Sequence, residues 1–339
     1  MKKFRIVWLV SLVLMLVVLS ACGQRASSNT GGSSPSASAG SSGSAETAAS
    51  GASANPVSVA TSTSAKADEI LHRNPNAKIA SVSIHITNNL LALGITPAGS
   101  VVGGDVKDFL PLVKDRLQGV ARFGVVTDPD MEAILALKPD VIFIDETYSG
   151  KDVAKFEQIA PTISIDMDEG TWRDHLTAVA EHAGREQQAQ AFIQSYDAKA
   201  EKVGKLIRAE LGENAKVMTI RSTAKELRVM GMKRPVGPIM YDDLDLRPAA
   251  GVEKIAKAYE VISQEVLPDF DADAIFVIIS KGSEAQSNYD ALRANPLWAG
   301  LKAVKNGHVY LLDGQTWLDY SSIGQDLALD DADKLFSRT

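Results

Sequence analysis

Residues 132–144 read EAILALKPDVIFI, and residues 265–277 read EVLPDFDADAIFV. The glutamate, the aspartate and the Ile-Phe pair recur at one common offset, and each copy has the pattern of a helix followed by a buried strand. An earlier pair, LGITPAG at 93–99 and LDLRPAAG at 244–251, repeats in the same order. Two copies of one unit, half a chain apart, predict two similar lobes. A cleft between two lobes is a favoured place for a ligand.

The first 22 residues have the pattern of a secretory signal, with a basic start and an apolar run over 6–19. That run is shorter than the roughly 20 residues that a membrane-spanning helix needs. The run ends in Leu19-Ser20-Ala21-Cys22, which closely resembles the bacterial lipobox. The resemblance implies that Cys22 becomes the lipidated N-terminus, which anchors the protein on the extracytoplasmic face of the cell membrane. An ordinary signal peptide with an incidental cysteine is the alternative.

Residues 23–66 consist mainly of Ser, Gly, Ala and Thr, so we expect a disordered tether. A tether of this length is typical of a Gram-positive cell surface. Loss of the signal with its three basic residues, Lys2, Lys3 and Arg5, takes the formal net charge from −7 to −10. An acidic chain of this kind is a poor binder of nucleic acid.

The folded part, residues 67–339, predicts an α/β fold with two Rossmann-like lobes and a ligand cleft between them. Strands alternate with helices over 67–184 and again over 212–339, which favours parallel sheets. Residues 79–86 alternate apolar and polar side chains and predict the first strand. Residues 185–211 interrupt this alternation of strands and helices with one long amphipathic stripe, so we expect a single long helix that joins the lobes.

Sequence signatures of enzymes are absent from the chain. It has no phosphate-binding GxxxxGK[ST] loop, no GxGxxG after a strand and no HExxH. Cys22 is the only cysteine, and the five histidines are scattered. A surface enzyme on an α/β scaffold is therefore disfavoured, as is a metal site built by the protein itself.

Glu132 and Glu265 both fall in the first turn of a predicted helix, where a carboxylate is stabilised by the helix dipole. That reading would suffice for one glutamate. Two at equivalent places of a repeat favour a paired docking role, with each inserting into an arginine pocket of a partner. A purely structural or adhesive lipoprotein would leave this duplication without a purpose.

Three segments, 131–144, 262–278 and 295–317, strongly resemble the solute-binding lipoproteins of iron–siderophore and cobalamin ABC importers. The resemblance extends over most of 78–336. It implies two lobes that close only modestly, no catalytic activity and a monomer that delivers its ligand to a permease dimer with its ATPase. It also implies that Glu132 and Glu265 meet arginines on the two permease subunits.

Ligand-binding residues are expected on loops after the strands, because open α/β sheets bind ligands at the carboxyl ends of their strands. Arginine donates paired hydrogen bonds to carboxylate-like oxygens, and aromatic faces suit the apolar rim of an iron chelate. The stretch 219–231 resembles the region of hydroxamate and carboxylate siderophore binders where an arginine in the place of Arg221 meets the ligand. The candidates for the cleft are His85, Asn88, Arg122, Tyr148, Trp172, Arg173, Arg221, Lys233, Arg234, Trp317 and Tyr320.

The ligand favoured by these residues is a ferric siderophore of the hydroxamate or citrate type. Its Fe³⁺ stays within the chelator, so the protein needs no cofactor and no metal ligands of its own. Cobalamin and haem are the alternatives for the same receptor role. Haem would take an axial ligand such as Tyr148 or His85, whereas cobalamin would favour an aromatic cleft with fewer cations.

Overall fold

The computed structural model describes residues 56–104 and 106–337. The signal over 1–22, Cys22 and the tether as far as residue 55 lie outside them. Helix α1 (Pro56–Arg73) covers the last part of the predicted tether. Ala67 and Leu71 of this helix are buried in the main hydrophobic core, and their packing stabilises a helix there. In the described part of the chain, no helix is long and apolar enough to cross a membrane.

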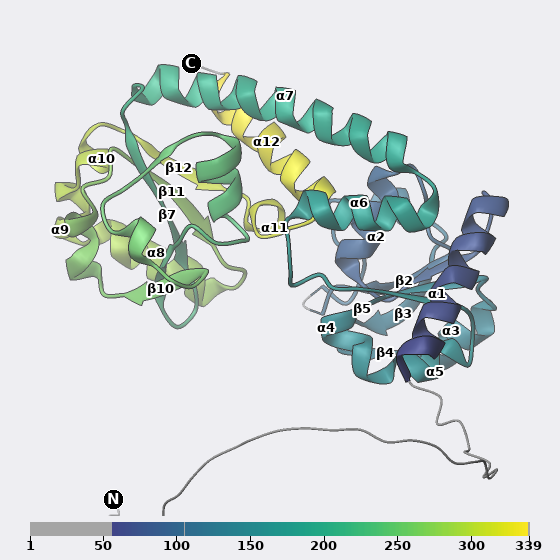
Figure 1. The fold of residues 1–339 in the computed structure, drawn as a ribbon. Helices are drawn as coiled ribbons and strands as arrows, with labels where there is room; N and C mark the ends of the chain where they lie inside the picture. Colours follow the sequence, from purple (N-terminus) through teal and green to yellow (C-terminus); the bar gives the residue numbers. More distant parts are fainter. Residues whose placement is uncertain (1–55, 105, 338–339) are drawn as a thin grey trace, which may run out of the picture. The chain divides into compact units, whose positions relative to one another are not determined.

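The N-terminal lobe is built on one sheet with the strand order β4-β3-β2-β1-β5-β6, parallel except for the β3–β4 pair. The helices of the lobe cover both faces of this sheet (Figure 1). Its strands are β1 (Ile79–Ser81), β2 (Gly99–Val102), β3 (Ala121–Val125), β4 (Asp128–Pro129), β5 (Val141–Asp145) and β6 (Thr162–Ile165). Its further helices are α2 (Ile84–Ala92), η1 (Lys114–Leu117), α3 (Met131–Leu137), α4 (Glu146–Ser149), η2 (Gly150–Asp152), α5 (Val153–Glu157) and α6 (Trp172–Ala183).

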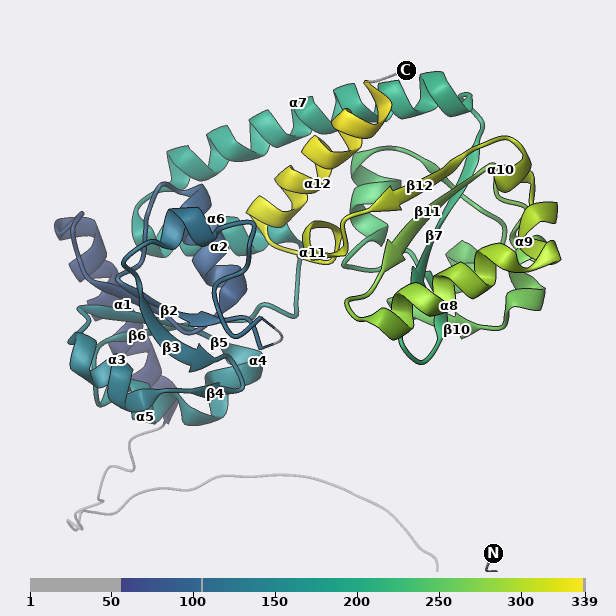
Figure 2. The same cartoon turned by 180° about the vertical axis from the view of Figure 1, so that it is seen from behind.

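The C-terminal lobe has a mixed sheet in the order β10-β8-β7-β11-β12, with β9 beside β7. Figure 2 shows β7, β11 and β12 side by side; these strands are parallel, and β8 and β10 extend the sheet in antiparallel fashion. The strands are β7 (Lys216–Ser222), β8 (Leu227–Met230), β9 (Arg247–Pro248), β10 (Tyr259–Ile262), β11 (Ala274–Ile279) and β12 (Val309–Leu312). The helices are η3 (Pro238–Asp243), η4 (Val252–Lys254), η5 (Gln264–Phe270), α8 (Ser283–Ala294), α9 (Pro296–Gly300), α10 (Lys302–Lys305), α11 (Gly314–Trp317) and α12 (Ser322–Phe336).

The repeated sequence unit forms equivalent strands in the two lobes. β5 pairs with β1 and β6, and β11 pairs with β7 and β12, all in parallel. The helix before the strand differs between the copies. α3 is an α-helix, whereas η5 is a 3₁₀ helix with Pro268 inside it, and proline lacks the N–H that an α-helix would use there.

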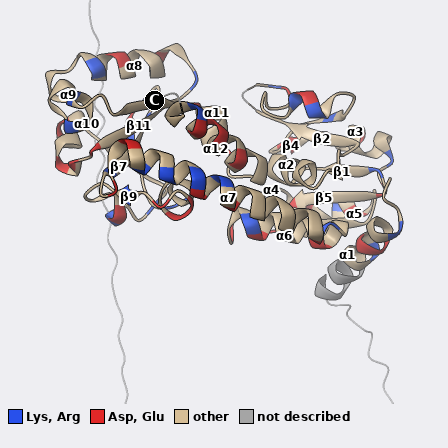
Figure 3. Cartoon of the chain, turned by 90° about the horizontal axis from the view of Figure 1, so that it is seen from above, with Lys and Arg blue, Asp and Glu red and all other residues tan. Residues whose placement is uncertain are grey.

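The long helix predicted over 185–211 is α7 (Glu186–Leu211), and it packs on α6, on η3 and on α12. The closing helix α12 packs on α7, and Figure 3 shows basic residues on α7 and acidic residues on α12. Lys199 Nζ donates to Asp326 at 2.6 Å and to Asp330 at 2.7 Å. Since α12 also packs on α2 of the N-terminal lobe, it adds a contact between the lobes to the connection made by α7.

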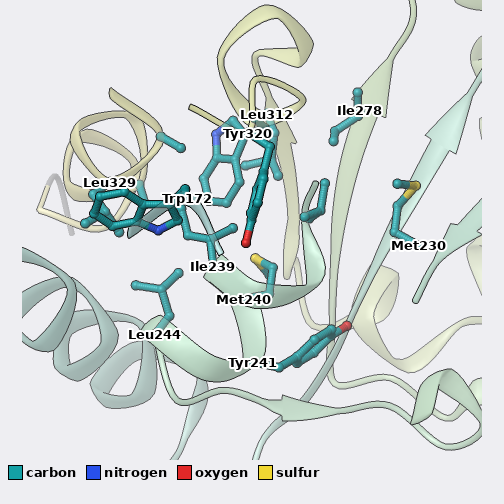
Figure 4. Close-up of a cluster of buried hydrophobic side chains, with 14 of the residues drawn as sticks. Trp172, Met230, Ile239, Met240, Tyr241, Leu244, Ile278, Leu312, Tyr320 and Leu329 are labelled. Atoms are coloured by element: carbon teal, nitrogen blue, oxygen red, sulfur yellow. The ribbon is translucent and has the colours of Figure 1, made fainter. Parts of the chain in front are cut away.

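The two lobes also share one hydrophobic core beside α7. Figure 4 shows Trp172 of α6 near Ile239, Leu244 and Leu329, which belong to η3, the segment after it and α12. All four residues lie in one buried cluster that continues into both sheets. A shared, close-packed core resists large relative rotation of the lobes.

Candidate ligand-binding cleft

A cavity of about 330 Å³ lies between the lobes. Both lobes contribute to its wall, through the start of α2 and the end of β5 on one side and through the end of β7 and α11 on the other. This is the carboxyl edge of the parallel strands, as expected for an α/β ligand site. The lining residues are Ser83, Ile84, His85, Leu110, Val126, Asp145, Tyr148, Arg221, Gly314, Gln315, Leu318 and Asp319.

Three of the predicted ligand-binding residues, His85, Tyr148 and Arg221, line this cavity. Tyr148 lies on α4 and leaves 57% of its surface exposed, which is high for an aromatic side chain. His85 lies in the first turn of α2, not in a loop. The predicted strand over 79–86 is therefore too long: β1 ends at Ser81, and the Oγ of Ser83 caps α2 by accepting a hydrogen bond from the backbone N–H of Ile86.

Arg221 is the basic group of the cleft. Its Nε donates to the Oγ of Ser280 at 2.9 Å, and no carboxylate among the described residues forms an ion pair with it. Burial, and then the nearby charge of Arg228, lower the pKa of Arg221. Arg228 itself pairs with Glu226 at 2.6 Å. The remaining guanidinium N–H groups of Arg221 can therefore donate to oxygen atoms of a ligand.

The acidic groups of the cleft were not among the predicted residues. Asp145 ends β5 and caps α4 through the N–H of Thr147, at 3.0 Å. Asp319 follows α11, is only 6% exposed and accepts a hydrogen bond from Asn88 at 2.9 Å. Burial raises the pKa of both carboxyl groups. Asp145 could have been found from its place at the end of a buried strand, whereas nothing in the sequence singles out Asp319.

Asn88 and Arg122 are held away from the cavity wall. Asn88 is fully buried, because it lies on the inward face of α2 and its amide is engaged by Asp319 and Ser321. Arg122 donates to Asp108 through Nε and a terminal nitrogen, at 3.2 and 2.9 Å. Both side chains have structural partners, and neither lines the cleft.

Trp172 and Arg173 begin α6 rather than forming a loop, because Thr171 and Asp174 make a capping box there. Trp172 is buried in the shared core, with its ring 4.6 Å from that of Tyr196. Arg173 forms ion pairs with Asp197 at 2.6 Å and with Asp243 at 3.0 Å. It joins α6 to the connecting helix and to η3, away from the cleft lining.

The remaining predicted residues, all in the C-terminal lobe, also stand apart from this cavity. Trp317 is 1% exposed and donates its ring N–H to Asp331 at 2.8 Å. Arg234 donates to the backbone oxygens of Met167 and Asp168 in the other lobe, with the ring of Tyr320 5.5 Å away. Burial raises the pKa of Tyr320. Lys233 is exposed beside Arg234 and forms no ion pair with any carboxylate of the described residues.

Glu132 and Glu265 are both exposed, each in the first turn of its helix. A hydrogen bond from the side chain of Ser263 lowers the pKa of Glu265. An exposed apolar side chain lies near each glutamate: Leu135, 59% exposed, and Val266, 37% exposed. Neither glutamate lines the cavity between the lobes.

The described residues contain no group of three or more His, Cys, Asp or Glu that could hold a metal ion. A further cavity of about 430 Å³ lies within the C-terminal lobe, and its lining includes Leu267, Leu297 and Lys302. Although it is larger, its wall comes from one lobe, holds only Asp271 and Lys302 as charged residues and has no aromatic side chain. We therefore take the cavity between the lobes as the candidate ligand site.

Comparison with known proteins places this geometry in context. The model of a family described as "periplasmic binding protein" matches residues 79–316. A probable siderophore-binding lipoprotein of Bacillus subtilis is 29% identical, covering 100% of both chains. A Fe(3+)-citrate-binding protein of the same organism is 30% identical over 68% of this chain and 71% of its own. A solved B. subtilis periplasmic binding component of a ferrichrome ABC transporter has a TM-score of 0.66 and 25% identity, covering 78% of this chain and 96% of that one.

Proposed function

Because the chain belongs to the periplasmic binding protein family, we propose that it captures a ferric siderophore outside the cell and delivers it to an ABC permease. The full-length likeness to a siderophore-binding lipoprotein and the likeness to a ferric-citrate-binding protein support iron uptake. Like the members of its family, the chain is a substrate-binding protein of a transporter; it is not an enzyme.

One observation carries the ligand class: Arg221 lies in the cleft and has no carboxylate partner in the described part of the chain. An arginine held there can donate to the oxygens of a hydroxamate or carboxylate chelate. Tyr148 and the apolar Ile84, Leu110 and Val126 provide a surface for the organic rim of that chelate. We propose a hydroxamate or citrate-type siderophore, with Fe³⁺ bound by the chelator and no cofactor bound by the protein.

The test is calorimetric titration of the full-length protein, freed of iron, with ferric hydroxamate and ferric citrate chelates. We expect saturable binding that weakens about tenfold or more in Arg221→Gln, the scale of one lost charge-assisted hydrogen bond. Arg122→Gln is the matched control, since Arg122 pairs with Asp108 outside the cleft wall. Equal effects of the two substitutions, or no binding of either chelate, would contradict the proposal.

Haem is the second candidate, because Tyr148 and His85 both line the cleft and either side chain can be an axial ligand. Cobalamin, which would favour a cleft with fewer cations, is titrated alongside it. A shift of the haem absorption band that disappears in Tyr148→Phe or His85→Ala would replace the siderophore by haem. Absence of such a shift, with saturable binding of a ferric chelate, would support the siderophore.

We further propose that the protein is anchored by lipid on Cys22, is a monomer and works on the extracytoplasmic face of a Gram-positive membrane. Support comes from the lipobox-like sequence and from the full-length relative, whose name includes "lipoprotein". Cys22→Ala should release the protein from the membrane fraction. Retention of this variant in the membrane would contradict lipid anchoring at this residue.

A further inference from the structure

The cleft contains a buried carboxylate whose second oxygen has no partner. Oδ2 of Asp319 accepts the hydrogen bond from Asn88, whereas Oδ1 is buried and accepts none within the described residues. Nε2 of His85 lies 4.0 Å from Oδ1. This separation exceeds the range of a hydrogen bond.

A second acceptor in the same wall is also unsatisfied. Oε1 of Gln315 is buried and has no donor among the described residues. Asp145, also in the wall, has no Lys or Arg partner there; its carboxylate is held by backbone N–H groups at the start of α4. Asp145 therefore has a structural role as a cap, but the free oxygens of Asp319 and Gln315 have none.

Unsatisfied buried acceptors cost stability, and buried charges are normally paired. Both groups here belong to residues that line a ligand cavity. The chemistry that complements them is an N–H donor with a positive charge. A neutral or anionic group placed beside Asp319 and Asp145 would leave the carboxylates uncompensated.

We infer that Asp319 and Asp145 form a subsite for a protonated amine carried by the ferric chelate, while Arg221 contacts the chelating oxygens. The inference rests on the proposed siderophore-binding function and specifies its ligand: a chelate with an ammonium group in addition to its oxygen donors. Gln315 supplies a further acceptor for the N–H groups of that ammonium. Asp319 and Asp145 then select between siderophores, and Arg221 serves all of them.

The test uses two ligands that differ only in the amine. Ferrioxamine B is a linear ferric trihydroxamate with a terminal amine, and its N-acetyl derivative keeps the same iron centre without the charge. We expect the full-length protein to bind the amine form about tenfold or more tightly, as for one charge-assisted hydrogen bond. Asp319→Asn and Asp145→Asn should each reduce this ratio, with little change in affinity for the acetylated form.

A further variant controls the test. Asp152→Asn removes the same charge from an exposed residue that pairs with Lys155 outside the cavity, and it should keep the wild-type ratio. Circular dichroism and thermal unfolding verify that each variant is folded, and Asp145→Asn provides an independent reading if Asp319→Asn is not.

Failures of the inference and of the proposed function can be told apart. Equal binding of the two ligands, or a wild-type preference that survives both aspartate substitutions, overturns the amine subsite while siderophore binding stands. If neither ligand binds, the hydroxamate class is wrong and the inference fails with it.

Discussion

Asn88 of the N-terminal lobe donates its side-chain N–H to Oδ2 of Asp319 in the C-terminal lobe, across 2.9 Å, and both residues are buried. The same nitrogen lies 3.1 Å from the Oγ of Ser321. The next residue of α2, Asn89, accepts a hydrogen bond from the hydroxyl of Ser322 at 2.8 Å. Two adjacent asparagines thus attach α2 to the start of α12, next to the ligand cleft.

Replacing Asn88 by alanine should therefore lower the free energy of unfolding. The substitution leaves a buried carboxylate with one donor fewer, which costs about 1–3 kcal/mol. Chemical denaturation at neutral pH measures the loss. Asn76→Ala, at an exposed turn, is the control and should change stability by less than about 0.5 kcal/mol. Equal stability of the two variants would mean that other groups satisfy Asp319 without Asn88.

The aspartates of the sequence repeat perform the same task in each lobe. Oδ2 of Asp140 accepts the backbone N–H of Lys78 at 2.7 Å, and Oδ2 of Asp273 accepts that of Lys216 at 2.7 Å. In return, the N–H of each aspartate donates to the carbonyl of the same lysine, at 2.9 Å and 2.7 Å. Each pair fixes the register at the start of two neighbouring parallel strands.

Asp140→Ala and Asp273→Ala should each cost about 1.5–3 kcal/mol of folding stability, the scale of a hydrogen bond to a charged group. Asp273 also pairs with Lys302, so its loss should be at least as large as that of Asp140. The double variant should lose the sum within about 0.5 kcal/mol, because the sites are in different lobes and share no partner. Denaturant titration of the three variants checks this, and a clear departure from the sum would show that the lobes are coupled.

The repeat explains why so much of the fold could be predicted. Its buried Ile-Phe strands became β5 and β11, and the amphipathic stripe over 185–211 became α7. Local patterns of two and 3.6 residues carry that information. The boundary at 79–86 was wrong because the side chain of one serine, Ser83, starts a helix inside an alternating pattern.

The cleft was harder to predict, because burial depends on contacts between distant segments. Trp172 and Trp317 are residue types that often bind ligands, but both are buried in the core. The residues next to them in the sequence do not predict this burial. Asp319 lay in a stretch without a motif, and only the fold brings it beside Asn88 and His85. Arg221 was found because it ends a strand, which is where α/β folds place such groups.

Asp319 should make folding stability depend on pH. Burial raises the pKa of its carboxyl group above the ordinary value of 3.8, so the folded protein binds this proton more tightly than the unfolded chain does. The stability that the protonated carboxyl contributes is complete below the unfolded pKa and is lost as pH rises through the folded one.

Asp319→Asn, which stays neutral, should therefore gain stability relative to the wild type as pH rises. Denaturation at a series of pH values from about 4 to 7.5 measures the difference. Asn76→Ala, which changes no titratable group, is the control and should differ from the wild type by a constant amount. A difference between Asp319→Asn and wild type that stays constant with pH would mean that the carboxyl titrates at its ordinary pKa.

Glu132 and Glu265 should act in transport and not in ligand capture. Both are exposed and neither lines the cleft. We expect Glu132→Ala with Glu265→Ala to abolish uptake of the ferric ligand in cells and to leave the Kd of the purified protein unchanged. Each single variant should retain part of the uptake, because one permease contact remains.

The controls are Glu186→Ala and Glu284→Ala, since these glutamates are also exposed in the first turn of a helix. They lose the same favourable interaction with a helix dipole, about 0.3–1 kcal/mol, without removing a docking group. Uptake should therefore survive in the double control variant. If it falls to the same extent in both double variants, the glutamates of the repeat serve only their helices. If the double variant Glu132→Ala with Glu265→Ala binds the ligand more weakly, these glutamates act on the cleft.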